Sequence, residues 1–277
     1  MSVMCCVYVP EGIIMAADSR LTKTQSMAIP QTIIKDGKQI QNFIPKETTF
    51  TLTDNAQKVI LIKKNKVGVS FCGNAIINGM TVADYIRKFE IDKINESDTT
   101  ETTAQKLSEC NISDETIFFV CGFDNDIPYV FTVQGKNVSR VNIETQQTPQ
   151  EQILLNATQD PKESKPEVGR PEPVQQEDPT PVQQVFHFLP IVQYGTLWGG
   201  KQTAITKLVN LQPRLIANYS TMTLKDAIDF AEFLVDLTIK YERFSDEIQT
   251  CGGEIDILVI TKDDSFWKQH KVYSPSK

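Results

Sequence analysis

A carboxylate and a guanidinium stand two positions apart near the start of the chain, at Asp18 and Arg20. They follow an apolar run at 13–17, which a Pro-Glu-Gly turn joins to an earlier apolar run at 2–9. This pattern predicts a β-hairpin. Because residues i and i+2 of a strand share a face, we expect the two charges to pair there. The hairpin brings the chain back to its own beginning, so any chemistry beside this pair would use the N-terminus itself.

Hydrophobic periodicity and turn residues predict further elements along the chain. We expect strands at 58–63, 67–72, 116–123, 129–133, 137–143, 255–261 and 266–273, and helices at 75–89, 99–110, 201–218 and 223–243. Strands and pairs of helices therefore follow each other in separate groups, which favours helices covering sheets over alternating βαβ units. The expected fold is α+β, a four-layer αββα sandwich of two mostly antiparallel sheets covered by two helix layers.

Two polar stretches interrupt these elements. The first, at 23–55, is expected to be an inserted loop or flap, with a turn at 36–37 and a short strand at 49–53. The second, at 144–184, is dominated by Gln, Pro, Glu and Thr and has no aromatic residue. Such a segment buries too little apolar surface to offset its ordering entropy. We expect a disordered insertion, either a linker or a partner-binding tail, within a single domain spanning 1–277.

The composition limits the class of protein. The chain has 277 residues, of which 40% are hydrophobic and 23% charged, and its net charge is −7. These values suit a soluble globular protein and argue against a nucleic-acid surface. No apolar run approaches the roughly 20 residues of a membrane-spanning helix, and no secretory signal is evident. Six cysteines without C-x-x-C spacing and two histidines argue against a zinc site. We expect a cytoplasmic protein without a metal or other cofactor.

Four blocks of the chain carry a resemblance to a known family. They are GIIMAADSRLT at 12–22, QKVILI with GVSFCGNA at 57–75, FVCGFD with YVFTV at 119–133, and CGGEIDILVITKDD at 251–264. The chain resembles the proteasome-like branch of the N-terminal-nucleophile hydrolases, which contains proteasome β-subunits and simpler bacterial self-compartmentalising proteases. The first and last blocks are the more specific. The resemblance covers nearly all of the chain outside the two polar stretches.

The resemblance implies a set of active-site residues. Asp18 matches the active-site aspartate of the family, and counting back from it places the nucleophile on Ser2. Lys58 matches the active-site lysine, Gly73 matches the glycine that contributes to the oxyanion hole, and Arg20 would brace the cluster. A lysine ammonium beside a hydroxyl lowers the pKa of that hydroxyl.

Removal of Met1 would expose the proposed nucleophile. Methionine aminopeptidase removes an initiator methionine when the next side chain is small, as it is at Ser2. The freed α-amino group, with a pKa of about 8, can then act as the general base near neutral pH. No histidine is required for this mechanism.

The chain departs from the family in the groups that orient the amine. The family usually has threonine where this chain has Ser2, and the turn at 197–200 lacks the hydroxyl of a family serine. A second Asp/Ser pair precedes the final Gly-Gly of the family. Here the spacing differs, and Asp246 and Thr250 are the candidates.

Several functions remain open at this level. The leading hypothesis is an endopeptidase of the threonine or serine type that acts on a peptide or amide substrate. The resemblance also implies a homo-oligomeric ring, and an ATPase or other regulatory partner is possible, without nucleic acid or membrane. The alternatives are a non-catalytic scaffold subunit, in which Asp18 and Arg20 are only a structural ion pair, and a non-proteolytic acylase.

Overall fold

The structure is a computed structural model that describes residues 2–35, 38–110, 112–143, 192–210, 217–246 and 248–271. Its contacts divide the chain into two compact units, one of Met1–Asn142 with Gln193–Lys277 and one of Ile143–Val192. In the second unit an isolated antiparallel bridge joins Ile143 to Val192. The expected insertion at 144–184 lies outside the described residues. Every helix and strand named below belongs to the first unit.

The first five-stranded sheet holds both ends of the first unit's chain. Its strands are β1 (Val3–Val9), β2 (Gly12–Ala17), β12 (Gly195–Gly200), β13 (Asp256–Ile260) and β14 (Ser265–Gln269). The order is β12-β1-β2-β13-β14, and every neighbouring pair is antiparallel. The hairpin predicted at the start of the chain is therefore confirmed as β1 and β2. Because β1 lies between two partners, Ser2 directly precedes a central strand.

The second five-stranded sheet comes from the middle of the chain. Its strands are β5 (Val59–Ile62), β6 (Val67–Cys72), β9 (Ile117–Asp124), β10 (Ile127–Gln134) and β11 (Asn137–Arg140). The order is β11-β10-β9-β6-β5, and it is again antiparallel throughout. All five strands lie where the sequence predicted them, within a few residues at their ends.

The two five-stranded sheets contact each other, with β1, β2 and β13 facing β5 and β6. Side chains of β1 alternate between two apolar clusters, as the two-residue period of a strand requires. Val3, Cys5 and Val7 face α5, whereas Met4 and Cys6 face the other sheet. Both faces of β1 are thus buried, which explains why its sequence is a continuous apolar run.

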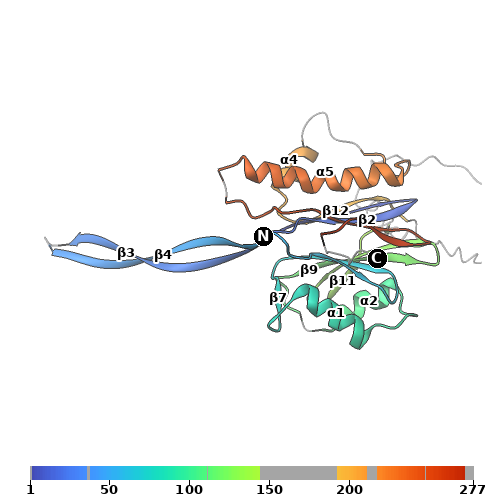
Figure 1. Ribbon diagram of the computed structural model, residues 1–277, viewed down its shortest axis with the longest axis horizontal. Coiled ribbons are helices and arrows are strands. Elements are labelled where there is room, and N and C mark those ends of the chain that lie inside the picture. Colours follow the sequence, from blue (N-terminus) through green and yellow to red (C-terminus); the bar gives the residue numbers. More distant parts are fainter. Residues whose placement is uncertain are drawn as a thin grey trace, which may run out of the picture. The chain divides into compact units, whose positions relative to one another are not determined.

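Four helices are described (Figure 1). They are α1 (Val82–Lys93), α2 (Thr100–Ser108), α4 (Thr203–Asn210) and α5 (Leu224–Arg243). α5 packs on β1 and β2, α1 contacts β5, and α2 contacts β9 and β10. The Thr223 hydroxyl caps α5 by accepting a hydrogen bond from the N–H of Asp226 at 3.2 Å.

The helix expected at 75–89 begins later than predicted. A small hairpin, β7 (Ile76–Ile77) with β8 (Met80–Thr81), precedes α1. Its turn is made by Asn78 and Gly79, which both have positive φ values of 51° and 78°. Asparagine and glycine tolerate this conformation better than other residues, so the chain turns before the helix starts.

The polar stretch at 23–55 is not a loop. It forms β3 (Leu21–Lys35) and β4 (Lys38–Thr53), which pair with each other as a long ribbon (Figure 1). The sequence interpretation was wrong here because none of the described side chains of the ribbon is buried, so no regular alternation of apolar and polar residues marks its strands. The expected turn at 36–37 lies outside the described residues.

The expected fold class is also wrong. Strands make up 44% and helices 24% of the structure, and the described residues form four separate sheets instead of two. Besides the two five-stranded sheets there are the β3–β4 ribbon and the β7–β8 hairpin. The error has a physical source. The two longest described strands, β3 and β4, pair only with each other and leave both faces in solvent. Their sequences therefore lack the continuous apolar runs that mark the buried strands.

No helix in the described part of the chain is both long enough and apolar enough to cross a membrane.

Candidate active site

Asp18 lies just after β2 with its side chain fully buried. Its Oδ1 accepts a hydrogen bond from the N–H of Val3 at 3.0 Å. Its Oδ2 accepts from the N–H groups of Arg20 at 3.1 Å and Gly252 at 3.0 Å. Each oxygen of this carboxylate therefore accepts at least one backbone hydrogen bond.

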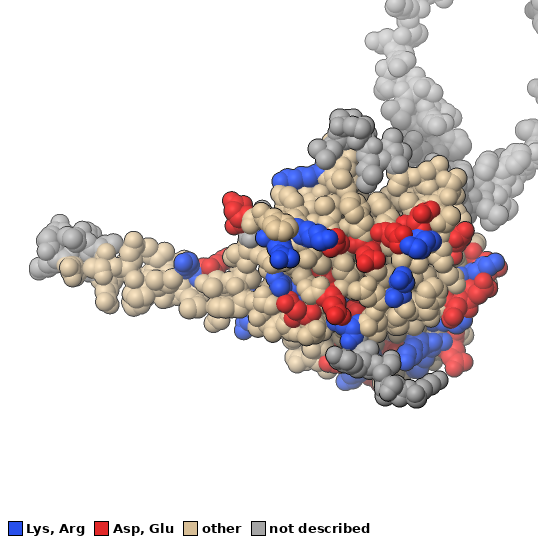
Figure 2. Space-filling view, turned by 45° about the horizontal axis from the view of Figure 1, so that its top comes forward, with Lys and Arg blue, Asp and Glu red and all other residues tan. Residues whose placement is uncertain are grey.

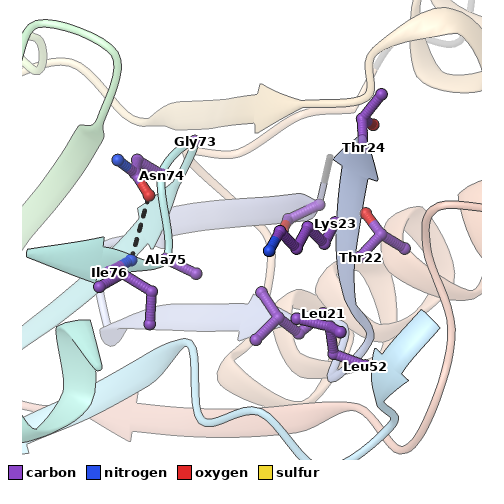
Figure 3. A pocket seen from close by; sticks show the side chains of 10 residues that line it. Leu21, Thr22, Lys23, Thr24, Leu52, Gly73, Asn74, Ala75 and Ile76 are labelled. Carbon is purple, nitrogen blue, oxygen red and sulfur yellow. Dashed lines mark hydrogen bonds between the residues drawn. The ribbon is translucent and has the colours of Figure 1, made fainter. Parts of the chain in front are cut away.

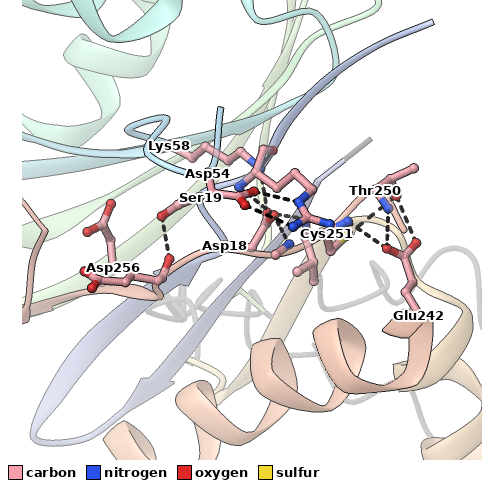
Figure 4. Close-up of polar contacts among 12 residues, drawn as sticks. Asp18, Ser19, Asp54, Lys58, Glu242, Thr250, Cys251 and Asp256 are labelled. Atoms are coloured by element: carbon pink, nitrogen blue, oxygen red, sulfur yellow. Dashed lines mark hydrogen bonds and ion pairs between the residues drawn. The ribbon is translucent and has the colours of Figure 1, made fainter. Parts of the chain in front are cut away.

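Lys58 joins the two large sheets at this point (Figure 4). It immediately precedes β5 of the second sheet, and its side chain is only 2% exposed. Its ammonium donates to Asp18 Oδ1 and to the carbonyl oxygen of Arg20, each at 2.6 Å. A buried ammonium requires partners of this kind, because removal from water costs several kcal/mol per ion. Lys58 is thus a fixed positive charge next to the start of β1.

The peptide group between Ser2 and Val3 is held by hydrogen bonds at both its carbonyl oxygen and its N–H. Its carbonyl oxygen accepts a hydrogen bond from the N–H of Lys201 at 2.7 Å, while the following N–H, of Val3, donates to Asp18. Gly200 passes so close that a Cβ there would lie 1.9 Å from the Ser2 oxygen, and its φ is +84°. A glycine is needed at this position, so Gly200, the last residue of β12, leaves room for the Ser2 carbonyl group.

Ser2 lines a pocket of about 460 Å³. The remaining walls come from Gly73 to Ile76 and from the base of the ribbon, at Leu21 to Thr24 and Leu52 (Figure 3). Within the wall at 73–76, the N–H of Ile76 donates to the side-chain oxygen of Asn74 at 3.2 Å, which forms a tight turn. A volume of this size falls within the range of about 300–1,000 Å³ typical of ligand sites.

Gly73 has a φ of +111°, and a Cβ at this position would lie 2.0 Å from the carbonyl oxygen of Glu115. No other residue fits there without a shift of the backbone. The backbone conformation therefore requires a glycine at position 73, and this glycine lines the same pocket as Ser2.

Arg20 does not form the side-chain pair with Asp18 that the sequence predicted. Its guanidinium makes a two-pronged contact with Asp54, at 2.6 Å from Nε and 3.0 Å from the terminal nitrogen. This contact raises the pKa of Arg20 and lowers the pKa of Asp54. The guanidinium also lies over Gly252, where a Cβ would come within 2.8 Å of it. Arg20 thus supports Asp18 through its backbone rather than its charge.

The two candidates near the end of α5 lie in different surroundings. Asp246 is exposed and lines a separate pocket with residues of α5, so the structure does not bring it to Ser2. Thr250 is buried, and its hydroxyl donates to Glu242 Oε1 at 2.9 Å. Its N–H donates to the other oxygen of the same carboxylate at 2.8 Å.

Glu242 is the functional candidate that the sequence interpretation missed. It is 1% exposed, it also accepts from the N–H of Cys251 at 2.7 Å, and it lies 3.6 Å from the ammonium of Lys201. A signal was present, because Glu242 continues the buried stripe of α5 four residues after Thr238. A charged residue on such a stripe indicates a buried hydrogen-bonded group.

The cysteines near this site are protonated. Burial raises the pKa of Cys72, the residue before Gly73, to about 11, although the ammonium of Lys58 acts in the opposite direction. Burial also raises the pKa of Cys251, and the charges of Asp18 and Glu242 add to that effect. A neutral thiol is a poor nucleophile, so these groups leave the Ser2 hydroxyl as the candidate.

Among the described residues, no group of three or more His, Cys, Asp and Glu side chains is placed to hold a metal ion. Comparison with known proteins gives no further guide: no known family matches the chain, and no characterised protein is similar enough to count as a relative. The resemblance to proteasome-like hydrolases, and the roles it implies, therefore stay predictions.

Proposed function

We propose that this chain is an N-terminal-nucleophile amidohydrolase, an endopeptidase that attacks its substrate with the Ser2 hydroxyl. One observation supports this most strongly. The buried ion pair of Lys58 and Asp18 lies one peptide unit from Ser2, and Ser2 shares a pocket with Gly73. A buried cation linked through Asp18 to the backbone beside Ser2, with Ser2 at the wall of a pocket, supports the Ser2 hydroxyl as the nucleophile.

The proposed reaction begins once Ser2 carries a free α-amino group. The neutral amine accepts the hydroxyl proton while Oγ bonds to the substrate carbonyl carbon. The backbone N–H of Gly73 donates to the oxyanion that forms, and such a donor typically contributes about 10²–10³ in rate. The protonated amine then gives its proton to the departing nitrogen as the amide bond breaks.

Water completes the cycle. It attacks the ester on Ser2 and loses a proton to the same amine, and the amine returns that proton to Oγ as the ester bond breaks. The Lys58 ammonium is held in place by Asp18 and the Arg20 carbonyl oxygen. Its role is electrostatic, since it favours the negative charge that develops on Oγ.

Two measurements on the purified full chain test this proposal. Intact mass should show that the mature protein begins at Ser2. Screening against a library of fluorogenic peptide amides should then find hydrolysis that falls by at least about 10³-fold in Ser2→Ala. Ser2→Thr should keep much of the activity because its hydroxyl can do the same chemistry.

The matched control is Ser139→Ala, at an exposed position of β11 far along the chain from the pocket residues. It should hydrolyse the same substrates at the rate of the unchanged protein. Equal hydrolysis by Ser2→Ala and the unchanged chain would contradict the mechanism, as would a mature protein that keeps Met1. A scaffold subunit predicts that no substrate in the library is cleaved by either protein.

A further inference from the structure

The ribbon of β3 and β4, here called the arm and defined as Leu21–Thr53, has almost no support from the rest of the chain. Its strands contact each other extensively and contact other elements little. Fifteen residues of strand extend about 50 Å. An isolated two-stranded ribbon is only marginally stable in water. An arm of this length therefore needs a surface to pack against.

Apolar side chains are concentrated on the arm. Of the 13 large apolar side chains that are exposed among the described residues, six belong to it: Met27, Ile29, Phe43, Ile44, Phe50 and Leu52. Ile29 lies directly opposite Ile44, and Met27 follows on the same face two residues along, so these three form a stripe. Phe43 is 61% exposed on the opposite face. Exposed apolar stripes of this kind mark protein interaction sites.

Two prolines limit how the arm can make contacts. Pro30 lies in β3 and Pro45 lies in β4, and neither can donate a backbone hydrogen bond to an added strand. Strand addition along the outer edges is therefore obstructed. The faces of the arm, which carry the apolar side chains, remain as the contact surface.

The charge of the arm is opposite to that of the rest of the chain. Residues 21–53 contain four lysines and two acidic residues, for a net charge of +2. The other 24 cationic and 33 acidic residues give −9, of which the 143–192 unit contributes −5 and the rest of the first unit, with 21 cationic and 25 acidic residues, −4. Figure 2 shows few charged side chains along the described part of the arm, compared with the many red and blue side chains on the body. The arm is thus an apolar, weakly basic element on an acidic protein.

We propose that the arm packs across the body of a second copy of this chain, the body being the first unit without the arm, which has a weak net negative charge. The isolated ribbon gains a supporting surface, its apolar stripe is buried, and its charge is matched. A nucleic acid would satisfy only the lysines and would leave the apolar stripe in water. This proposal does not depend on the hydrolase activity, although the base of the arm lines the Ser2 pocket and would couple assembly to access.

The oligomeric state of the purified full chain tests the proposal. Light scattering after size exclusion, at about 1–100 µM, should give a mass of at least twice 31.2 kDa. The variant Ile29→Ser, Ile44→Ser, Phe50→Ser changes three exposed apolar residues on one face of the arm. It should run as a monomer, with a dissociation constant raised by at least about a hundredfold, because three large apolar contacts are lost. Far-UV circular dichroism should show that the body stays folded.

A matched control replaces two isoleucines and one phenylalanine that are exposed elsewhere, in the variant Ile91→Ser, Ile127→Ser, Phe266→Ser. This control should associate like the unchanged chain. A monomeric unchanged chain over the whole concentration range would overturn the proposal, and so would equal association of the arm variant. Equal loss in the control would do the same, since it would show unspecific apolar association.

A second measurement does not require the triple variant to fold. A photo-reactive phenylalanine analogue in place of Ile44, on the apolar stripe, should crosslink the purified protein into dimers, with the attachment points on the body of the partner copy. Crosslinks found only within one chain, or none at all, would contradict the proposal.

Discussion

Two buried carboxylates, Asp18 and Glu242, accept backbone hydrogen bonds from one short segment, 250–252, and they are built differently. Both are almost inaccessible to solvent, and both accept several hydrogen bonds. Asp18 has an ammonium at 2.6 Å, from Lys58. The nearest ammonium to Glu242 is that of Lys201, at 3.6 Å, beyond the usual length of a hydrogen bond.

The difference separates two tasks. Asp18 keeps a charge in place beside the proposed nucleophile. Glu242 connects the end of α5 to the loop at Thr250 and Cys251, and so fixes the backbone that leads to Gly252. Carboxylates of similar burial can therefore serve chemistry in one case and chain geometry in the other. The predictions below test this division.

The largest effect is expected for Lys58→Met. The substitution leaves Asp18 as a buried carboxylate without its cation, which typically costs about 3–5 kcal/mol. Urea unfolding should therefore show a loss of that size, and hydrolysis should be lost with it. Lys63→Met, at an exposed position five residues away, serves as the control and should change little. A loss below about 1 kcal/mol would mean that Lys58 is not needed to hold Asp18.

A smaller effect is expected for Glu242→Gln. Glutamine can keep its oxygen on the N–H groups of Thr250 and Cys251, which both donate to Oε2, but its NH₂ group then replaces the acceptor that faces the Thr250 hydroxyl and the Lys201 ammonium, at a cost of about 1–3 kcal/mol. Unfolding should become easier while hydrolysis falls less than in Lys58→Met. Glu232→Gln, on the same helix and partly exposed, is the matched control. If Glu242→Gln abolished hydrolysis without changing stability, the division between the two carboxylates would be wrong.

Arg20→Gln should have a modest effect that depends on pH. Its partner Asp54 has a side chain that is 45% exposed, so solvent screens the pair and its contribution is expected to be about 0.2–1 kcal/mol. The pKa of Asp54 is lowered in the folded state. The contribution is therefore present above the unfolded pKa of about 3.9 and is lost as pH falls through the lower folded value.

Urea midpoints measured at pH 7 and pH 2.5 should show this. The variant and the unchanged chain should differ at pH 7 and converge at pH 2.5, and added salt should reduce the difference at pH 7. A difference that persists at the lower pH would point to packing of the guanidinium over Gly252 as its cause.

The smallest effect is expected at Cys251, whose raised pKa has burial as its main cause and both carboxylates as further causes. Iodoacetamide at pH 8 should leave this thiol unmodified in the folded protein and should react first with Cys110, which is partly exposed. Peptide mapping after short exposure checks the order. Early modification of Cys251 would show that the loop between the two carboxylates opens readily.

Local patterns in the sequence were sufficient to predict many of the helices and strands that form the scaffold. The hairpin of β1 and β2, the strands of the second sheet and the helix α5 follow from periodicity and turn residues, because each is stabilised by neighbours close in sequence or by a buried face. The fold class was missed, since the arm hides two long strands among polar residues whose pairing leaves both faces exposed.

The site was predictable only in part. Asp18 and Arg20 stand out by position, but the partner of Arg20 is Asp54, which is 34 residues away and is brought near by the arm. The role of Glu242 depends on the loop after α5, whose path no local rule gives. Contacts of this kind are set by tertiary packing, so the residue types can be recognised before their partners can.

The position of Ser2 at the entrance of β1 has a consequence for how the chain matures. Chain ends usually fray, and exopeptidases trim frayed ends residue by residue. Here the carbonyl of Ser2 and the N–H of Val3 are both held by hydrogen bonds, and the next residues form the middle of a sheet. An aminopeptidase that removes residues up to this point would meet a backbone it cannot extract, so trimming would stop at Ser2 without a dedicated signal.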